Sequence, residues 1–194
     1  MLRQSRGSAR ALMAPLALGA ILSLAAFLPF PSRGGGASTV ILVRHAEKAL
    51  TPGDDPVLDS IGQRRARALA AALLHTKVDA ILVTQYRRTR LTAEPMARAS
   101  GVTPRVVDTR AGGAAHAMAV ADAARAEVGK TVLVVGHSNT IPAIVRALGG
   151  SAEAMADGDY DDLYVVIIPS SGAARTIHAR YGAPARSAAA AASR

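Results

Sequence analysis

Two histidines and two arginines in this chain stand where their side chains could handle a phosphate group. Arg44 and His45 directly follow one β-branched run of residues, and His137 directly follows another. Arg88 lies at the start of a helical segment, shortly after a third apolar run. Arginine binds phosphate oxygens through two parallel hydrogen bonds, and a neutral imidazole can act as a nucleophile. These residue types together predict an oxyanion pocket that contains two imidazoles.

The apolar runs alternate with segments of helical periodicity. Strands are expected at residues 39–43, 78–83, 105–107, 131–135, 163–168 and 174–181. Helices are expected at residues 60–75, 86–100, 115–127 and 141–148. Ser60 and Gln63 have the spacing of a capping box, Pro95 predicts a bend, and Pro142 suits the first turn of its helix.

Apolar strands that alternate with helices indicate parallel pairing, with helices on both faces of the sheet. We therefore expect an α/β fold, a three-layer α/β/α sandwich with a mostly parallel sheet. In such sheets, ligands bind beyond the carboxyl ends of the strands. Arg44, His45, Arg88 and His137 should therefore meet at one edge, together with Ser138, which follows His137.

Four short segments, in this order along the chain, add a resemblance. They are Val43–Glu47, the spaced residues Leu58, Gly62 and Ala66, Thr84–Arg88 with Thr92–Glu94, and Gly136–Ser138. At these separations they resemble the signature of the histidine phosphatase superfamily, the phosphoglycerate mutase-like fold, over about residues 39–168. The chain looks like a short, exported branch of that family. It departs from the usual pattern at Gln85 and Tyr86, where the family has proline and leucine.

The resemblance implies a role for each matching residue. Arg44, Arg88, His137 and Ser138 would bind the phosphoryl group, and His45 would attack phosphorus and hold the phosphate until water removes it. The implied reaction is hydrolysis of a phosphomonoester or a phosphohistidine, with no metal or other cofactor. Nearby arginine charge should keep the His45 imidazole neutral, as a nucleophile must be.

The family's usual carboxylate proton donor has no obvious counterpart here. His116 is the expected donor, because it is the titratable group of the Gly/Ala-rich segment after Asp108. Asp108, Asp161 and Glu47 are lesser candidates. If His116 is instead an exposed loop residue, the enzyme has no dedicated acid and suits substrates with good leaving groups, such as phosphohistidine.

Three other interpretations remain open at this stage. Ser138 could be the nucleophile of a serine hydrolase, although Thr140 replaces the closing glycine of a nucleophile elbow. His45, Glu47 and His137 could hold a metal ion, although the arginines would repel a cation. The domain could also be a catalytically inactive, exported module that binds phosphorylated ligands.

The N-terminal segment resembles a targeting element. Three arginines precede twenty uncharged residues, 11–30, and Gly35 and Ala37 could precede a cleavage site. We expect a signal peptide or membrane anchor at 1–37, a phosphatase domain at 38–182 and a disordered Ala-rich tail at 183–194. The protein should then be exported, in the periplasm or secreted, with possible membrane association through its N-terminal segment.

Composition limits the partners. The net charge of +9 falls to +5 without residues 1–37, and no basic stripe with interleaved aromatics predicts nucleic-acid binding. The chain has no cysteine, which excludes disulfides and thiolate chemistry. The loops at 49–57, 108–116 and 149–160 are short, so an open site is expected, for a phosphorylated small molecule, lipid-linked sugar or protein. The sequence carries no prediction of oligomeric state.

Overall fold

The architecture comes from a computed structural model, which describes residues 36–185. The predicted signal peptide or membrane anchor lies outside these residues, apart from its last two positions, and so does most of the predicted tail. Among residues 36–185, no helix is both long and apolar enough to cross a membrane.

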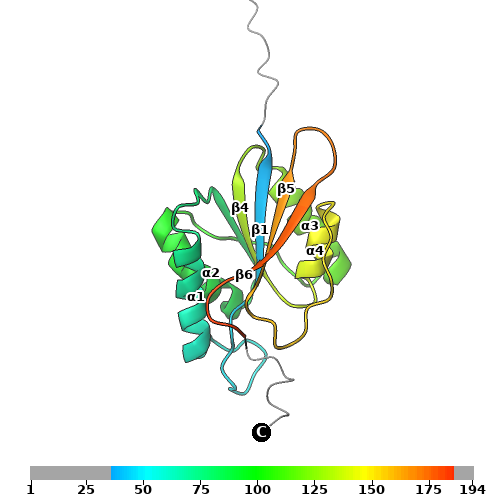
Figure 1. Cartoon of the computed structure of the whole chain (residues 1–194). Helices are drawn as coiled ribbons and strands as arrows, with labels where there is room; N and C mark the ends of the chain where they lie inside the picture. Colours follow the sequence, from blue (N-terminus) through cyan, green and yellow to red (C-terminus); the bar gives the residue numbers. More distant parts are fainter. Residues whose placement is uncertain (1–35, 186–194) are drawn as a thin grey trace, which may run out of the picture. The chain divides into compact units, whose positions relative to one another are not determined.

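A single six-stranded sheet forms the centre of the domain (Figure 1). Its strands are β1 (Ser38–Arg44), β2 (Ala80–Val83), β3 (Arg105–Val106), β4 (Thr131–Gly136), β5 (Asp162–Ile168) and β6 (Arg175–Arg180). Their order across the sheet is β3-β2-β4-β1-β5-β6. The first four in this order pair in parallel, and β5 and β6 add antiparallel pairs at one side.

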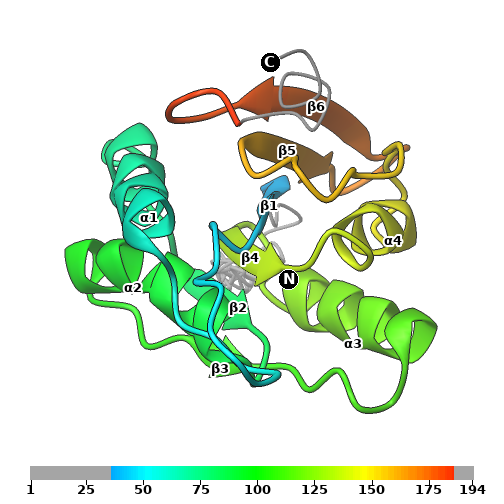
Figure 2. The same cartoon turned by 90° about the horizontal axis from the view of Figure 1, so that it is seen from below.

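Four helices cover the two faces of the sheet (Figure 2). They are α1 (Ser60–Ala72), α2 (Arg87–Ser100), α3 (Gly113–Arg125) and α4 (Ile141–Ala147). Helices α1 and α2 lie on one face, and α3 and α4 lie on the other. The predicted three-layer α/β/α fold with a mostly parallel sheet is therefore confirmed.

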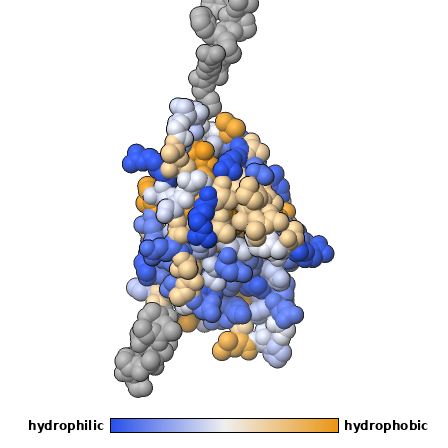
Figure 3. Space-filling view, turned by 90° about the vertical axis from the view of Figure 1, so that its right-hand side faces the viewer, coloured by the Kyte–Doolittle hydropathy of each residue, from blue (hydrophilic) through white to orange (hydrophobic). Residues whose placement is uncertain are grey.

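Alternation along the strands divides the core between these two faces. In β1, Val40 and Leu42 pack in the cluster beneath α3 and α4, whereas Ile41 and Val43 pack beneath α1 and α2. Successive side chains of a strand point to opposite faces, so the middle of this central strand, residues 40–43, is apolar at every position. The outer surface on the side of α3 and α4 is mixed, with weakly apolar atoms bordered by hydrophilic ones (Figure 3).

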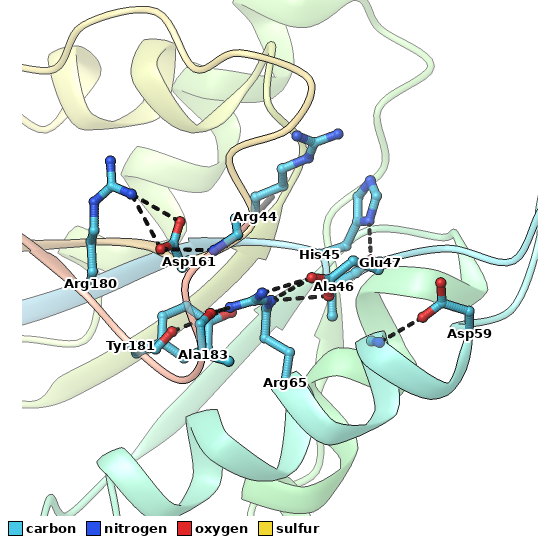
Figure 4. Close-up of polar contacts among 12 residues, drawn as sticks. Arg44, His45, Ala46, Glu47, Asp59, Arg65, Asp161, Arg180, Tyr181 and Ala183 are labelled. Atoms are coloured by element: carbon cyan, nitrogen blue, oxygen red, sulfur yellow. Dashed lines mark hydrogen bonds and ion pairs between the residues drawn. The ribbon is translucent and has the colours of Figure 1, made fainter. Parts of the chain in front are cut away.

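The start of α1 differs from the predicted capping box. The N-cap is Asp59, whose Oδ1 accepts a hydrogen bond of 2.7 Å from the Gly62 amide (Figure 4). Ser60 is already the first helical residue, so the prediction that Ser60 and Gln63 form the cap was one residue late. The aspartate satisfies one of the free amides at the helix N-terminus in the same way.

The other helix features predicted from the sequence differ less from the structure. Pro142 lies in the first turn of α4, as predicted. Pro95 lies inside α2, which continues past it to Ser100 and ends at Gly101 in the left-handed conformation. Helix α3 runs from Gly113 to Arg125, so it begins and ends two residues before its predicted bounds.

Candidate active site

The turn that follows β1, residues 44–47, is the centre of the site, and we call it the β1 turn. Arg44 lies opposite Gly136 in the parallel pairing of β1 with β4, and the His45 amide donates to the Gly136 carbonyl at 2.8 Å. His45 and His137 therefore follow the neighbouring strands β1 and β4 at the same height of the sheet. The predicted meeting of these residues at one sheet edge results directly from this register.

Helices α1 and α2 hold the β1 turn in place. The Ala46 amide donates to Thr92 Oγ1 of α2 at 2.9 Å. Glu47 points away from His45 and forms a bidentate ion pair with the buried Arg65 of α1, with a shortest distance of 2.7 Å (Figure 4). A Cβ atom at Gly62 would lie 2.1 Å from the Glu47 carbonyl oxygen, so only glycine allows this close approach.

His45 is oriented as a nucleophile. Its Nδ1 lies 2.8 Å from the Ala46 carbonyl oxygen, which can only accept, so Nδ1 carries the proton and Nε2 keeps its lone pair. Burial and, to a lesser extent, the charges of Arg44 and Arg88 together lower the pKa of His45 to about 4, against the opposing effect of the Ala46 hydrogen bond. The imidazole is therefore neutral at neutral pH.

His137 lies beside His45, with 5.3 Å between the ring centroids. Its Nε2 is 3.1 Å from Thr84 Oγ1, which also contacts Thr89 Oγ1 at 3.0 Å. Burial, together with smaller effects of His45 and Arg88, lowers the pKa of His137 to about 3. Both imidazoles are therefore uncharged, and a polar chain from α2 fixes the second ring.

Each of the two arginines stacks on a tyrosine. The Arg44 guanidinium carbon lies 4.0 Å from the centroid of the Tyr160 ring, and that of Arg88 lies 4.1 Å from the centroid of the Tyr86 ring. Such stacking restricts a guanidinium while leaving its edge free for an oxyanion. Tyr86, which replaces the family's leucine, thus supports the arginine two residues along.

These groups line one polar pocket of about 380 Å³. Its lining consists of Arg44, His45, Lys48, Tyr86, Arg88, Thr109, Gly113, His137, Ser138, Asn139, Thr140 and Asp157. Five of the six predicted site residues are in this set. Arg88 lines the pocket and Arg87 does not, in agreement with the predicted register. Hollows of about 440 to 560 Å³ elsewhere on the domain have no histidine in their lining.

The sixth predicted residue, His116, lies in α3 outside the pocket lining. It is not the exposed loop residue of the alternative interpretation, because only 1% of its surface is exposed and Nδ1 lies 3.0 Å from the Asp108 carbonyl oxygen. Its position puts it close enough to influence His137 electrostatically. Its role as proton donor stays a prediction.

The interpretation of a metal site finds no geometric support. Glu47 is paired with Arg65 and points away from the two histidines. Within residues 36–185, no three His, Asp or Glu side chains are grouped as metal ligands would be.

Several pocket residues were missed in the sequence. Asp157 lines the pocket from the loop before the antiparallel strand β5, and Tyr160 of the same loop stacks on Arg44. Lys48 and Asn139 had a usable signal, because each follows a predicted strand end by a few residues. For Asp157, no spacing in the sequence shows that its loop folds back over Arg44.

Comparison with known families gives a match to the histidine phosphatase superfamily (branch 1) over residues 40–112. No curated protein matches the chain. The matched segment contains the β1 turn and Arg88, and it ends before His137. The predicted resemblance to this superfamily is therefore confirmed independently of the motif that contains the second histidine.

Solved structures match over most of the described domain. A protein from Nakamurella multipartitia, provisionally named the phosphohistidine phosphatase SixA, is 25% identical, with a TM-score of 0.56, over 76% of this chain and 98% of that one. The protein of the same provisional name from Agrobacterium tumefaciens is 25% identical, with a TM-score of 0.56, over 75% and 98%. A mycobacterial glucosyl-3-phosphoglycerate phosphatase is 17% identical, with a TM-score of 0.56, over 76% and 100%, and this likeness concerns the fold alone.

Proposed function

Because the chain is a phosphatase of the histidine phosphatase superfamily, we propose that it hydrolyses a phosphomonoester or phosphohistidine through a covalent phosphohistidine on His45. One observation carries this proposal. The hydrogen bond from His45 Nδ1 to the Ala46 carbonyl leaves an unprotonated Nε2 in a pocket that also contains two arginines. A neutral imidazole beside fixed positive charge is the arrangement that attack on a phosphate dianion needs.

In the first step, His45 Nε2 forms a bond to phosphorus while the bond to the leaving group breaks. In the second step, water attacks phosphorus, the P–N bond breaks and inorganic phosphate leaves. The covalent route replaces one difficult displacement with two easier ones. No step of the proposed route uses a metal or another cofactor.

Arg44 and Arg88 would stabilise the charge on the equatorial oxygens in both steps. Arg44 Nη1 donates to the Ala156 and Asp157 carbonyls at 3.1 and 2.8 Å, and Arg88 Nη1 donates to the Asp54 carbonyl at 3.1 Å. Held in this way, the guanidiniums need little reorganisation when charge develops. His137 and Ser138 would complete the set of donors around the phosphoryl group.

The substrate class is a phosphorylated small molecule, a lipid-linked sugar or a protein. The names of the related structures refer to a phosphohistidine and to a glucosyl-3-phosphoglycerate, so phosphate on very different carriers is consistent with this fold. The pocket is shallow, polar and formed by short loops, which supports a site that grips the phosphate and leaves the carrier outside.

A rapid-quench experiment with labelled substrate tests the nucleophile. Acid-labile, base-stable label should accumulate on the wild-type chain, and His45→Ala should lose both the label and turnover while keeping the wild-type circular dichroism spectrum. Label on Ser138, or turnover by the His45→Ala variant, would refute the mechanism.

The same experiment discriminates the two alternatives. A serine hydrolase would need a base beside Ser138. The next histidine along the chain, His178, lies on β6, and its Nε2 is hydrogen-bonded to Asp162 Oδ1 at 2.9 Å. A module that only binds phosphorylated ligands would show neither label nor turnover. The intact set of Arg44, His45, Arg88 and His137 favours the enzyme.

We also propose export, from the three arginines and the uncharged run at the N-terminus. The phosphatase domain would then act outside the cytoplasm, in the periplasm or after secretion.

A further inference from the structure

Hydrolysis of an alkyl phosphate needs a group that protonates the departing oxygen, since an alkoxide is a poor leaving group. That group must lie in the pocket with His45. It must also be free to exchange its proton with water once per turnover. These two requirements can be applied to the acidic side chains around the site.

The lesser candidates from the sequence do not line the pocket, and each is paired with another residue. Glu47 is occupied by Arg65, and Asp161 accepts from Arg180 and from the Ala185 amide (Figure 4). Asp108 is paired with Arg110, whose hydrogen bonds lower the pKa of that carboxyl to about 2. None of these carboxylates lines the pocket.

His116 meets the requirements poorly. Its ring is buried, it does not line the pocket, and its Nδ1 is committed to the Asp108 carbonyl. A proton on its other nitrogen would have to pass through the wall of the pocket to reach a leaving oxygen. This buried position fits a packing role for His116 better than a role in proton transfer.

Asp157 is the one acidic residue in the lining of the pocket. Its side chain is exposed, and among residues 36–185 only its backbone oxygen has a hydrogen-bond partner. Water can therefore reach the carboxyl group, as repeated protonation requires. Its place at the rim puts it where a leaving group would depart from a phosphate held deeper in the pocket.

The loop of Asp157 is fixed by the phosphate-binding machinery itself. Arg44 Nη1 donates to the carbonyls of Ala156 and Asp157. Asp159 Oδ2 accepts from the Ala156 amide at 2.8 Å and closes the turn. The Tyr160 ring stacks on the Arg44 guanidinium. The position of Asp157 is therefore tied to the residue that would hold the phosphoryl oxygens.

We infer that Asp157 is the general acid of this site and that its substrates include alkyl phosphomonoesters. The inference rests on the proposed phosphohistidine mechanism. In the first step, the Asp157 carboxyl donates its proton to the leaving oxygen as the P–O bond breaks, which releases an alcohol. In the second step, the carboxylate takes a proton from the attacking water as the P–N bond breaks, which restores the acid and releases phosphate.

Three cationic side chains, Arg44, Lys48 and Arg88, face the same pocket as Asp157 and would hold the phosphate dianion there, while the neutral His45 and His137 add no charge.

The test compares two leaving groups in the full-length chain. Asp157→Asn should lower kcat/KM for glycerol 1-phosphate by about 10²- to 10⁴-fold. It should change kcat/KM for p-nitrophenyl phosphate by less than about fivefold, because nitrophenolate leaves without protonation. Glu153→Gln, which removes an exposed carboxylate from the same loop, is the matched control and should match the wild type with both substrates.

Equal effects of Asp157→Asn on both substrates, or no effect on either, would overturn the inference. The inference would also be overturned if His116→Gln lowered kcat/KM for glycerol 1-phosphate alone while Asp157→Asn kept wild-type values with both substrates. Phosphoenzyme trapping separates this outcome from a failure of the mechanism. If wild type and Asp157→Asn both form phosphohistidine from p-nitrophenyl phosphate, the proposed function holds whatever the result with glycerol 1-phosphate.

Discussion

Acidification should destabilise this domain well before its carboxylates titrate, because His45 and His137 are buried in the neutral form. Their pKa values lie at about 4 and about 3 in the folded chain, below the ordinary 6.5. The unfolded chain therefore binds more protons between these limits. The stabilisation is fully present above about pH 6.5 and is lost as the pH falls towards 4.

The magnitude follows from the number of protons. Each histidine contributes about 1.4 kcal/mol per pH unit, so the two together give a slope of about 2.7 kcal/mol per unit. Between pH 6.5 and 4.5, the free energy of unfolding should fall by about 5 kcal/mol. That is a large share of the roughly 5–15 kcal/mol typical of a domain.

Urea unfolding of the purified chain in phosphate-free buffers, at half-unit steps from pH 7 to 4.5, measures this slope. His137→Gln should halve it. His75→Gln removes an exposed histidine and should leave it unchanged. A wild-type free energy that is flat over this range, or an equal slope in His137→Gln, would show that the rings are not buried as neutral imidazoles.

Three further predictions concern the phosphate pocket, the β1 turn and location. Arg88→Ala should lose about 2–4 kcal/mol of transition-state stabilisation in kcat/KM, and Arg87→Ala much less; the reverse ranking would mean that the register of α2 is wrong. Gly62→Ala should lower the free energy of unfolding by about 1–3 kcal/mol and reduce activity, because its Cβ must displace the Glu47 carbonyl; a melting temperature equal to wild type would contradict that contact. A reporter enzyme that is active only after export, fused after residue 194, should be active, and a cytosolic full-length product would refute export.

Much of the site could be predicted because its residues directly follow strands. Arg44, His45 and His137 come within one or two residues of an apolar run, and parallel pairing brings such positions to one edge. Local patterns are enough for this inference. The family resemblance then distinguished Arg88 from Arg87, which periodicity alone could not.

What could not be predicted depends on contacts between distant segments. Asp157 and Tyr160 belong to a loop with no local signal, and they meet Arg44 across more than a hundred residues. Arg65 carries no local sign of burial, yet it is buried against Glu47. His116 was an ambiguous residue in a Gly/Ala-rich segment, and its burial depends on how α3 packs in the folded domain.

The position of β1 in the sheet has a consequence for how the chain folds. This strand comes first in the described domain, but its neighbours β4 and β5 come near the end, so that Val40 pairs with both Val132 and Val166. Closing such long loops costs entropy before any pairing compensates for it, which slows folding. Until β4 and β5 have been made, both edges of a strand with an apolar centre, residues 40–43, are unpaired and prone to aggregate. An incomplete chain would therefore need protection along β1 and could not form the pocket, so phosphatase activity should be among the last properties to develop during refolding.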